Sequence, residues 1–443
     1  MKIQLSDHFT YQRLIRFTIP SIVMMIFISI YGIVDGIFVS NFAGKTAFAA
    51  VNLIYPPIMV MGAFGFMLGT GGSALVAKTM GEGDLKKANR IFSMLVYVSI
   101  ALGLVLMTAG YVFIRPVAAF LGAEGQMLDD CVSYAHVLLP AVTCFMLQTL
   151  FQSFFITAEK PHLGLAVTVA AGVSNMGLDA LFIAGFGWGL KGAALATGIG
   201  ITVGAVIPLV YFSVSSDSIL KLGRTGFDGH ALLKSCTNGI SEMMSELSMS
   251  VVTMLYNFQL MRIAGENGVA AYGSIMYINF IFVSVFFGYS MGVEPVISYH
   301  YGAGNHTELK NLFGKCLKLL AVCGAVMAVI AELAADTMAG IFVGYDEELM
   351  EMTTAGLRIY AFSFLLAGIN IFGSGLFTAL NNGLVSAVIS FLRTLVFETA
   401  AVLILPALFG IDGVCAAIIV AETAALVITA VFFIRYKDRY HYC

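Results

Sequence analysis

Long apolar segments recur along the whole chain, and they constrain the fold more than any other feature. A helix needs about 20 mostly apolar residues to cross the hydrocarbon core of a bilayer. Twelve stretches reach this length, and several exceed it enough to indicate tilt, kinks or projecting ends. We therefore expect an all-α integral membrane protein with twelve transmembrane helices. The predicted spans are 15–40, 47–77, 90–114, 131–157, 162–184, 189–213, 235–262, 268–299, 311–335, 352–380, 384–406 and 411–435.

The composition excludes a soluble protein. Only 11% of the 443 residues are charged and 59% are hydrophobic, whereas soluble proteins have about 25% charged residues. The chain cannot cover itself with polar surface, so we expect the lipid bilayer to surround it. A net charge of −3 gives no reason to expect a nucleic-acid partner, and the seven scattered cysteines match neither a disulfide framework nor a metal site. No cleavable signal peptide is recognisable, so the first span should stay in the membrane.

The lysines and arginines predict the orientation. Basic residues concentrate in cytoplasmic segments of membrane proteins. If the N-terminus is cytoplasmic, most of the 23 basic residues lie inside, and so does the C-terminus. The exceptions are Lys45, Arg115, Lys191, Arg262 and Arg358 in outer segments, and Arg393 within a span. The acidic segment 344–352 then forms an outer loop.

The sequence also matches itself at an offset of 221 residues. "MGEGDLKKANRIF" (Met80–Phe92) lies on "YGAGNHTELKNLF" (Tyr301–Phe313), and "WGLKGAA" (Trp188–Ala194) lies on "FGIDGVC" (Phe409–Cys415). Other pairs at this offset are Gly44 with Gly265, Gly71 with Gly292 and Thr157 with Thr378. The offset contains six spans, an even number, so the halves form a parallel repeat with a site expected between or within them.

This repeat predicts the domain organisation. We expect an N-terminal six-helix bundle over residues 1–213 (the N-lobe) and a C-terminal one over 235–443 (the C-lobe). The polar residues 214–234 should form a cytoplasmic linker between them.

An isolated carboxylate marks the first span. In "SIYGIVDGIFVSN" (Ser29–Asn41), Asp35 is far from any other charge in the sequence. A charged side chain within a bilayer is costly and is a functional candidate by default. "SNMGLDALF" (Ser174–Phe182) places Asn175 and Asp179 at i and i+4, on one face of the fifth helix.

These polar groups are expected at one depth. Asp35 and Asp179 lie about six residues before the outer ends of their helices, and Thr197 about eight residues after its helix enters, so all lie about 9–12 Å below the outer surface. The group can hold a small cation, which prefers oxygen ligands. It can equally hold a proton, because two close carboxylates resist ionising together, or it can simply join helices. The repeat counterparts of Asp35, Asn175, Asp179 and Thr197 are Tyr256, Val396, Ala400 and Ile418.

Several motifs resemble those of the multidrug and toxic compound extrusion (MATE) transporters. They are "YGIVDGIFVSNFAG" with Pro20 upstream, the loops "MGEGDLKKA" and "YGAGNHTEL", "PVISYHYGAGN" (Pro295–Asn305) and "WGLKGAALATG". The resemblance covers essentially the whole chain and is greatest to the bacterial branch that includes MepA-type exporters. It implies a V-shaped pair of bundles that exports drugs or metabolites, often organic cations, in exchange for Na⁺ or H⁺ by alternating access.

The resemblance also implies roles for particular residues. The family's N-lobe ion ligands match Asp35, Asn175, Asp179 and Thr197, with the Ala193 carbonyl as a further candidate. Pro20 and Tyr31 match positions implicated in bending of the first helix. We expect a multi-pass protein of the bacterial plasma membrane that functions as a monomer, has no catalytic residues and needs no cofactor beyond the coupling ion.

The sequence departs from another branch of the family, which carries acids in its seventh and tenth helices. Met249 stands at the seventh-helix position, with Glu246 one turn away, and Ala367 stands at the tenth-helix position. A C-lobe ion site of that type is therefore not expected.

The C-terminal half has its own ionisable residues within spans, which are Glu242, Glu246, Glu294, Arg393, Glu398 and Glu422. They can form an acidic wall that attracts cationic substrates or carries protons. Alternatively they form interhelical pairs, such as Arg393 with Glu398 or Glu422, since an unpaired buried charge is costly. Both interpretations stay open.

Two other functional classes fit the sequence less well. A lipid-linked oligosaccharide flippase should line its cavity with several basic residues, but only Arg393 lies within a span. An intramembrane enzyme should carry a catalytic motif, but the sequence has no His-Glu-x-x-His, no Gly-x-Ser-x-Gly and no phosphate-binding loop. The sequence therefore favours a cation-coupled exporter.

Overall fold

The computed structural model describes residues 3–42, 45–344 and 346–443. Gly44 of the predicted repeat and Tyr345 of the predicted outer loop lie outside these ranges. All elements of the described part are helical. The first half has α1 (Tyr11–Phe42), α2 (Lys45–Gly81), α3 (Leu85–Phe120), α4 (Gly125–Leu138), η1 (Leu139–Ala141), α5 (Val142–Thr157), α6 (Pro161–Asp179), η2 (Ala180–Gly185) and α7 (Gly189–Val214). The second half has α8 (Gly229–Gly302), α9 (His306–Leu333), α10 (Ala335–Val343), α11 (Glu347–Ala361), α12 (Phe364–Ala379), α13 (Gly383–Phe391), η3 (Leu392–Phe397) and α14 (Glu398–Tyr440).

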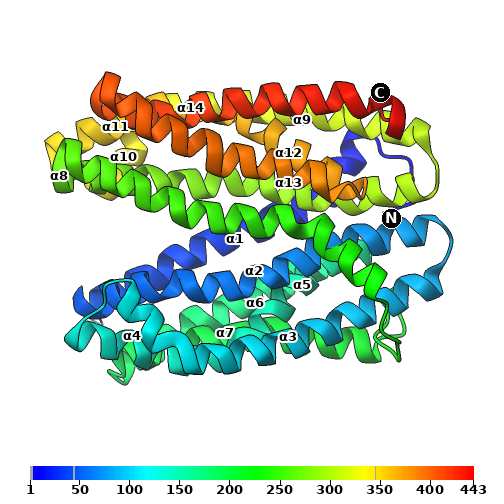
Figure 1. The fold of residues 1–443 in the computed structure, drawn as a ribbon, viewed down its shortest axis with the longest axis horizontal. Helices are drawn as coiled ribbons and strands as arrows, with labels where there is room; N and C mark the ends of the chain where they lie inside the picture. Colours follow the sequence, from blue (N-terminus) through cyan, green and yellow to red (C-terminus); the bar gives the residue numbers. More distant parts are fainter. Residues whose placement is uncertain (1–2, 43–44, 345) are drawn as a thin grey trace.

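The helices form two bundles that lie side by side. Figure 1 shows α1–α7 in one bundle and α8–α14 in the other, with both chain termini at the same end of the molecule. The helices α1 and α2 of the first bundle pack against α8 of the second. The predicted all-helical fold in two bundles is confirmed.

The number of spans depends on how two broken helices are counted. By length and composition, nine helices of the described residues can cross a membrane, or ten if the pair α11 and α12, bent by 51°, forms one span. Segment 383–440 counts once, although Gly410 (φ 61°, ψ −134°) breaks it into two. Segment 229–264, which ends at the break at Gly265, is not counted because its Ser, Thr, Asn and Glu side chains lower its hydropathy. Counting α11 with α12 as one span, segment 383–440 as two spans and segment 229–264 as one gives the twelve predicted spans.

The repeat is visible in matching turns. Gly83 (φ 88°) and Gly304 (φ 66°) both adopt the left-handed conformation that favours glycine. The next residue in each copy caps the following helix. Asp84 Oδ1 accepts a bond from the Lys87 amide at 2.9 Å, and Asn305 Oδ1 accepts one from the Glu308 amide at 3.1 Å. A side-chain oxygen at this position accepts a hydrogen bond from a backbone amide that has no acceptor within the helix. The helices that follow the two loops, α3 and α9, therefore begin with the same kind of cap.

Glycines make the contact between the bundles close. A Cβ added to Gly71 of α2 would overlap the backbone of α8 at Gly239, and a Cβ on Gly239 would overlap the backbone of α2. The offset of 221 residues maps this pair onto Gly292 and Thr18, which also touch. Gly81 and Gly302 make the same kind of contact, against the carbonyl groups of Tyr299 and Lys78 respectively. The interface between the bundles therefore has approximate two-fold symmetry.

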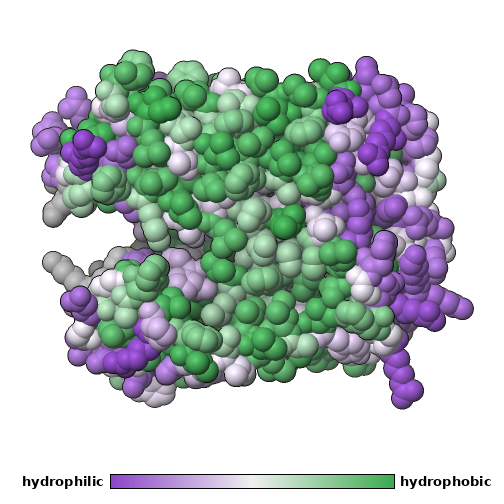
Figure 2. Space-filling model, in the orientation of Figure 1, coloured by the Kyte–Doolittle hydropathy of each residue, from purple (hydrophilic) through white to green (hydrophobic). Residues whose placement is uncertain are grey.

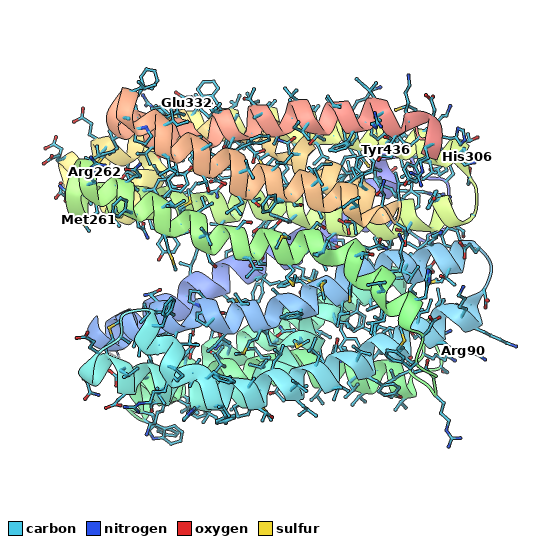
Figure 3. All side chains as sticks on the ribbon, viewed as in Figure 1. Arg90, Met261, Arg262, His306, Glu332 and Tyr436 are labelled. Carbon is cyan, nitrogen blue, oxygen red and sulfur yellow. The ribbon has the colours of Figure 1, made fainter. Side chains whose placement is uncertain are left out.

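A notch separates the bundles at one end only. The space-filling view in Figure 2 shows it at the end opposite the chain termini, with a broad hydrophobic belt between two more hydrophilic ends. Figure 3 places Met261 and Arg262 at the notched end, and Arg90 and His306 at the other. Arg262 and Arg90, predicted on opposite sides of the membrane, thus lie at opposite ends.

At the closed end, residues 3–10 form an N-terminal strap that contacts both bundles. The Leu5 amide donates to Glu159 Oε1 of the first bundle at 2.8 Å. The Phe9 amide donates to Glu308 Oε1 of the second at 2.9 Å. The side chains of Leu5 and Phe9 are fully buried. The strap therefore joins the start of α1 to the C-terminal bundle.

We expect Glu308→Ala to loosen the closed end. The substitution removes the acceptor of the Phe9 amide and of His8 Nδ1, which lies 2.6 Å from Glu308 Oε2. A hydrogen bond to a charged group contributes about 1.5–3 kcal/mol. In a variant with its native cysteines replaced by serine, a cysteine at the buried position His300 should react severalfold faster with a polar thiol reagent. Glu332→Ala, at the other end of α9, is the control. Equal rates of cysteine labelling in both variants would contradict the idea that Glu308 holds the closed end together.

Candidate cation site in the N-terminal bundle

The structure brings the predicted cation ligands together from three helices. Asp35 comes from α1, Asn175 and Asp179 from α6, and Thr197 from α7. These helices contact one another within the first bundle. Asp179 is fully buried and Asn175 nearly so, while Asp35 and Thr197 are half-buried. Ala193 is buried on α7, one turn before Thr197.

The two carboxyl groups lack the partners that buried acids need. Asp35 and Asp179 lie within electrostatic range of each other. Oδ1 of Asp35 and both carboxylate oxygens of Asp179 are buried and meet no hydrogen-bond partner at ordinary distance and angle among the described residues, although Asp35 and Asn175 both approach the Asp179 carboxyl group closely. Asn175 Nδ2 lies 3.5 Å from Thr197 Oγ1 and donates toward it. Because buried polar groups are almost always paired, this arrangement fits a proton or a cation between the carboxyl groups.

Local backbone features allow the three helices to meet. The α-helical geometry of α6 ends at Asp179, and the π-helix η2 follows directly. Such π segments are rare and often occur at functional sites. Glycines lie on both sides of the site. A Cβ on Gly172 would lie 3.1 Å from the Tyr31 ring of α1, and one on Gly200 would lie 2.8 Å from Cβ of Asn175. Both distances are shorter than an ordinary contact, so glycine permits the close packing.

Tyr134 belongs to the site but was missed from the sequence. Its side chain comes from α4, is fully buried, and lies close to Thr197 and within electrostatic range of Asp35 and Asp179. A single tyrosine in an apolar segment has no spacing pattern that would reveal it. Its proximity follows from the packing of α4 against α7.

The two residues expected to bend the first helix lie at different distances from the site. Tyr31 is on α1 one turn before Asp35 and within electrostatic range of that carboxyl group. Pro20 is buried near the start of α1, about four turns from Asp35. Since proline has no backbone N–H, α1 lacks one hydrogen bond there, a local weakness at which the helix can bend.

Three acids of the second half lie along α8. Glu242 and Glu246 are half-buried in its first part, and Glu294 is nearly fully buried in its second part. Glu242 lies within electrostatic range of both others. Ser290 Oγ donates to Glu294 Oε1 at 3.2 Å. The structure therefore groups these acids on the helix that borders the first bundle.

The remaining ionisable residues of the second half form a closed cluster. Of the two partners left open for Arg393, the structure selects Glu422, with Nη2 and Nε of Arg393 at 2.8 and 2.9 Å from Glu422 Oε1. Asn370 Nδ2 donates to Glu422 Oε2 at 2.6 Å. Glu398 lies within electrostatic range of both members of the pair. Neither Met249 nor Ala367 supplies a carboxylate here, as the sequence indicates.

The donor set of the N-terminal site limits which ion it fits. Within residues 3–42, 45–344 and 346–443, no three His, Cys, Asp or Glu side chains are placed to hold a metal ion together. The site instead offers two carboxylates, an amide and a hydroxyl. Oxygen ligands with only two charges suit a small hard monovalent cation or a proton better than a soft transition metal.

Comparison with known families decides the identity of the fold. The sequence model of the MatE family matches residues 20–181 and 242–405, which is most of the chain. The chain belongs to the MatE family. The predicted resemblance to MATE transporters is thereby confirmed. Members are transporters, so this MatE protein is not an enzyme, and its family and apolar helices make it a multi-pass protein of the plasma membrane.

Curated relatives and solved structures agree with this assignment. The multidrug export protein MepA of Staphylococcus aureus (strain MSSA476) is 25% identical over 97% of this chain and 94% of its own. MepA of Staphylococcus saprophyticus is 24% identical over the same shares. A crystal structure of MATE in complex with MaL6 matches with a TM-score of 0.93 at 23% identity, covering 98% of this chain and 97% of the other. An outward-facing MATE family transporter matches with a TM-score of 0.92 at 22% identity, with the same coverage. These structures establish the shared fold.

We expect Tyr134→Phe to weaken ion binding without disturbing the fold. The change removes only the hydroxyl next to Thr197 and keeps the buried ring. The shift in melting temperature that Na⁺ or acid produces should shrink by at least half in the purified protein. Tyr211→Phe removes another buried hydroxyl, from α7, and should leave the shift intact. Identical shifts in both variants would show that the Tyr134 hydroxyl does not contribute to ion binding.

Proposed function

We propose that this MatE protein is a secondary active exporter that exchanges organic, often cationic compounds for Na⁺ or H⁺ by alternating access. The observation that carries the proposal is the pair of buried carboxyl groups, Asp35 and Asp179, with three unpartnered oxygens. An ion-coupled transporter needs a site that is incomplete without its ion. Asn175, Thr197 and the Ala193 carbonyl supply the further oxygen ligands.

The substrate class is supported by the relatives and by the acids of α8. Curated relatives over nearly the whole chain are named multidrug export proteins. Glu242, Glu246 and Glu294 would make the border between the bundles attractive to cations. We propose that drugs or metabolites bind between the bundles and that the protein works as a monomer.

The predicted orientation in the membrane determines which side of the membrane the notch faces. If the lysine and arginine distribution is read as usual, both termini are cytoplasmic and the protein lies in the bacterial plasma membrane. The notch in Figure 2, opposite the termini, then faces outward. The closed end, with the glycine contacts and the N-terminal strap, is the cytoplasmic gate in this conformation.

The proposed coupling acts through α1. Two adjacent carboxylates repel each other in a low-dielectric interior, and a bound cation or proton removes that repulsion. Ion binding from outside therefore draws α1 toward α6 and α7, and ion release lets it move away, with bending at Pro20 and Tyr31. By linkage, ion and substrate must weaken each other's binding by the same factor.

A flippase of lipid-linked oligosaccharides, or an exporter of another metabolite, remains the alternative within this superfamily. A flippase needs free basic groups for the pyrophosphate. The one basic residue predicted within a span, Arg393, is already bonded to Glu422. The structure therefore offers no observation that favours a flippase over a drug exporter.

Asp35→Asn and Asp179→Asn should each reduce gradient-driven export at least tenfold. The amide has the size of the carboxyl group but cannot bind a cation by charge or carry the proton. Export of an ethidium-like dye from proteoliposomes, under an imposed Na⁺ or pH gradient, measures the effect and identifies the coupling ion. Asp412→Asn, an exposed acid of the other bundle, should export at the parental rate. Normal export by Asp35→Asn, with unchanged ion dependence, would refute the proposed coupling site.

The orientation has its own test. In a variant without native cysteines, Asp346→Cys should react with an impermeant thiol reagent added to intact cells. Thr225→Cys, in the predicted cytoplasmic linker, should react only after the cells are opened, because that linker lies inside. Labelling of Thr225→Cys in intact cells would show that the linker lies outside and would contradict the predicted orientation.

A further inference from the structure

The two bundles treat buried acids in opposite ways. In the first, Asp179 is fully buried and both its oxygens lack a partner among the described residues. In the second, Glu422 is equally buried, yet Oε1 accepts two bonds from Arg393 and Oε2 accepts one from Asn370. The Asp179 carboxylate therefore needs a proton or cation from outside the protein, whereas the Glu422 carboxylate is already neutralised by Arg393.

The Arg393–Glu422 pair lies on the two helices that correspond to α6 and α7 in the repeat, because the offset of 221 residues maps Arg393 onto Gly172 and Glu422 onto Ile201. Asp179 lies on the fifth helix of the first half, and Arg393 lies on the corresponding helix of the second. Both helices contain a π segment, but at different places, since η2 begins directly after Asp179 whereas η3, which includes Arg393, corresponds to residues 171–176 of the first half. The exact counterparts of Asp179 and Thr197 are Ala400 and Ile418, so the Arg393–Glu422 pair lies one to two turns deeper.

The charges around the pair come from every neighbouring element. Glu398 follows η3 at the start of α14, Glu242 faces it from α8, and Tyr360 faces it from α11. Tyr256 of α8 lies beside Glu398. With Arg393 present, the Glu422 charge is balanced. Without Arg393, neither Glu242 nor Glu398 would have a basic group within electrostatic range among the described residues, and Glu422 would lose its ion pair.

We infer that Arg393 is a built-in counter-ion that keeps the C-terminal bundle from binding a coupling ion. A guanidinium stays charged at any physiological pH and cannot dissociate from the chain. The Glu422 site is thus permanently filled, and only the N-terminal bundle responds to the ion gradient. This inference rests on the proposed function, because it assigns ion coupling to one bundle.

The inference predicts that removing the guanidinium exposes a latent ion site. A buried carboxylate that loses its partner must take up a cation or a proton. The test uses thermal unfolding of the purified protein across Na⁺ concentration and pH, in an Asp35→Asn background that removes one of the two acids of the N-terminal site. Asp35→Asn alone should show little Na⁺-dependent shift, and the pH response that Asp179 retains in it is the baseline for the other variants. Adding Arg393→Met should restore a shift of several degrees, and adding Glu422→Gln as a third change should abolish it again.

Two further variants separate this role from a purely structural one. Arg393→Lys keeps a tethered cation, so in the Asp35→Asn background it should remain unresponsive. Arg393→Met with Glu422→Gln, in the parental protein, removes both charges while Gln can still accept the bond from Asn370. This neutral pair should export with the parental ion dependence, because it leaves nothing for an ion to balance.

The outcomes distinguish this inference from the proposed function. If Asp35→Asn/Arg393→Met folds but responds to neither Na⁺ nor pH more than Asp35→Asn does, Arg393 does not mask an ion site. Loss of coupled export in the neutral pair would also overturn the inference. If the parental protein shows no ion response that Asp35→Asn removes, the proposed N-terminal site fails instead, whatever Arg393 does.

Discussion

A carboxylate in the interior of a membrane protein needs a partner, and the rest of this structure depends on how that need is met at Asp179. Neither oxygen of its buried side chain has a hydrogen-bond partner within the described part of the chain. Asp35 approaches it from α1 and brings a second acid rather than a donor. The free energy of this pair therefore depends on a bound proton or cation. A helix whose position depends on ion occupancy is what an ion-driven conformational change requires.

The position of α1 affects more than the ion site, because the same helix begins at the interface between the bundles. The N-terminal strap before α1 bonds to Glu308 of the C-terminal bundle, and Thr18 touches Gly292 of α8. A shift of α1 at Asp35 is thus transmitted to contacts that hold the closed end together. Those contacts are related in pairs by the repeat, so the bundles can separate by rotating about a shared symmetric interface. In the proposed coupling, ion binding and gate opening act on the same helix, and Pro20 lies between the two places.

The sequence could group the residues of the candidate site because depth and charge can be inferred without a structure. Asp35, Asn175, Asp179 and Thr197 stand out as polar residues at matched distances from helix ends, and the fold brings them together. Tyr134 could not be predicted, since its role depends on how α4 packs against α7. The partner of Arg393 stayed open for the same reason, as Glu398 and Glu422 are both acids on nearby helices. The N-terminal strap was not predicted either, because its hydrogen bonds use backbone amides that every residue has.

The two bundles share a repeated helix arrangement and differ in where their charge balance comes from. In the C-terminal bundle the balancing cation, Arg393, is part of the chain and is bonded to Glu422. In the N-terminal bundle the proposed coupling takes the balancing cation from solution, so that α1, α6 and α7 are held together when it is bound and released when it leaves. A symmetric pair of labile sites would loosen both bundles at once. One fixed and one labile site leave a rigid bundle for the other to move against, and the strap ties the moving helix α1 to that rigid partner.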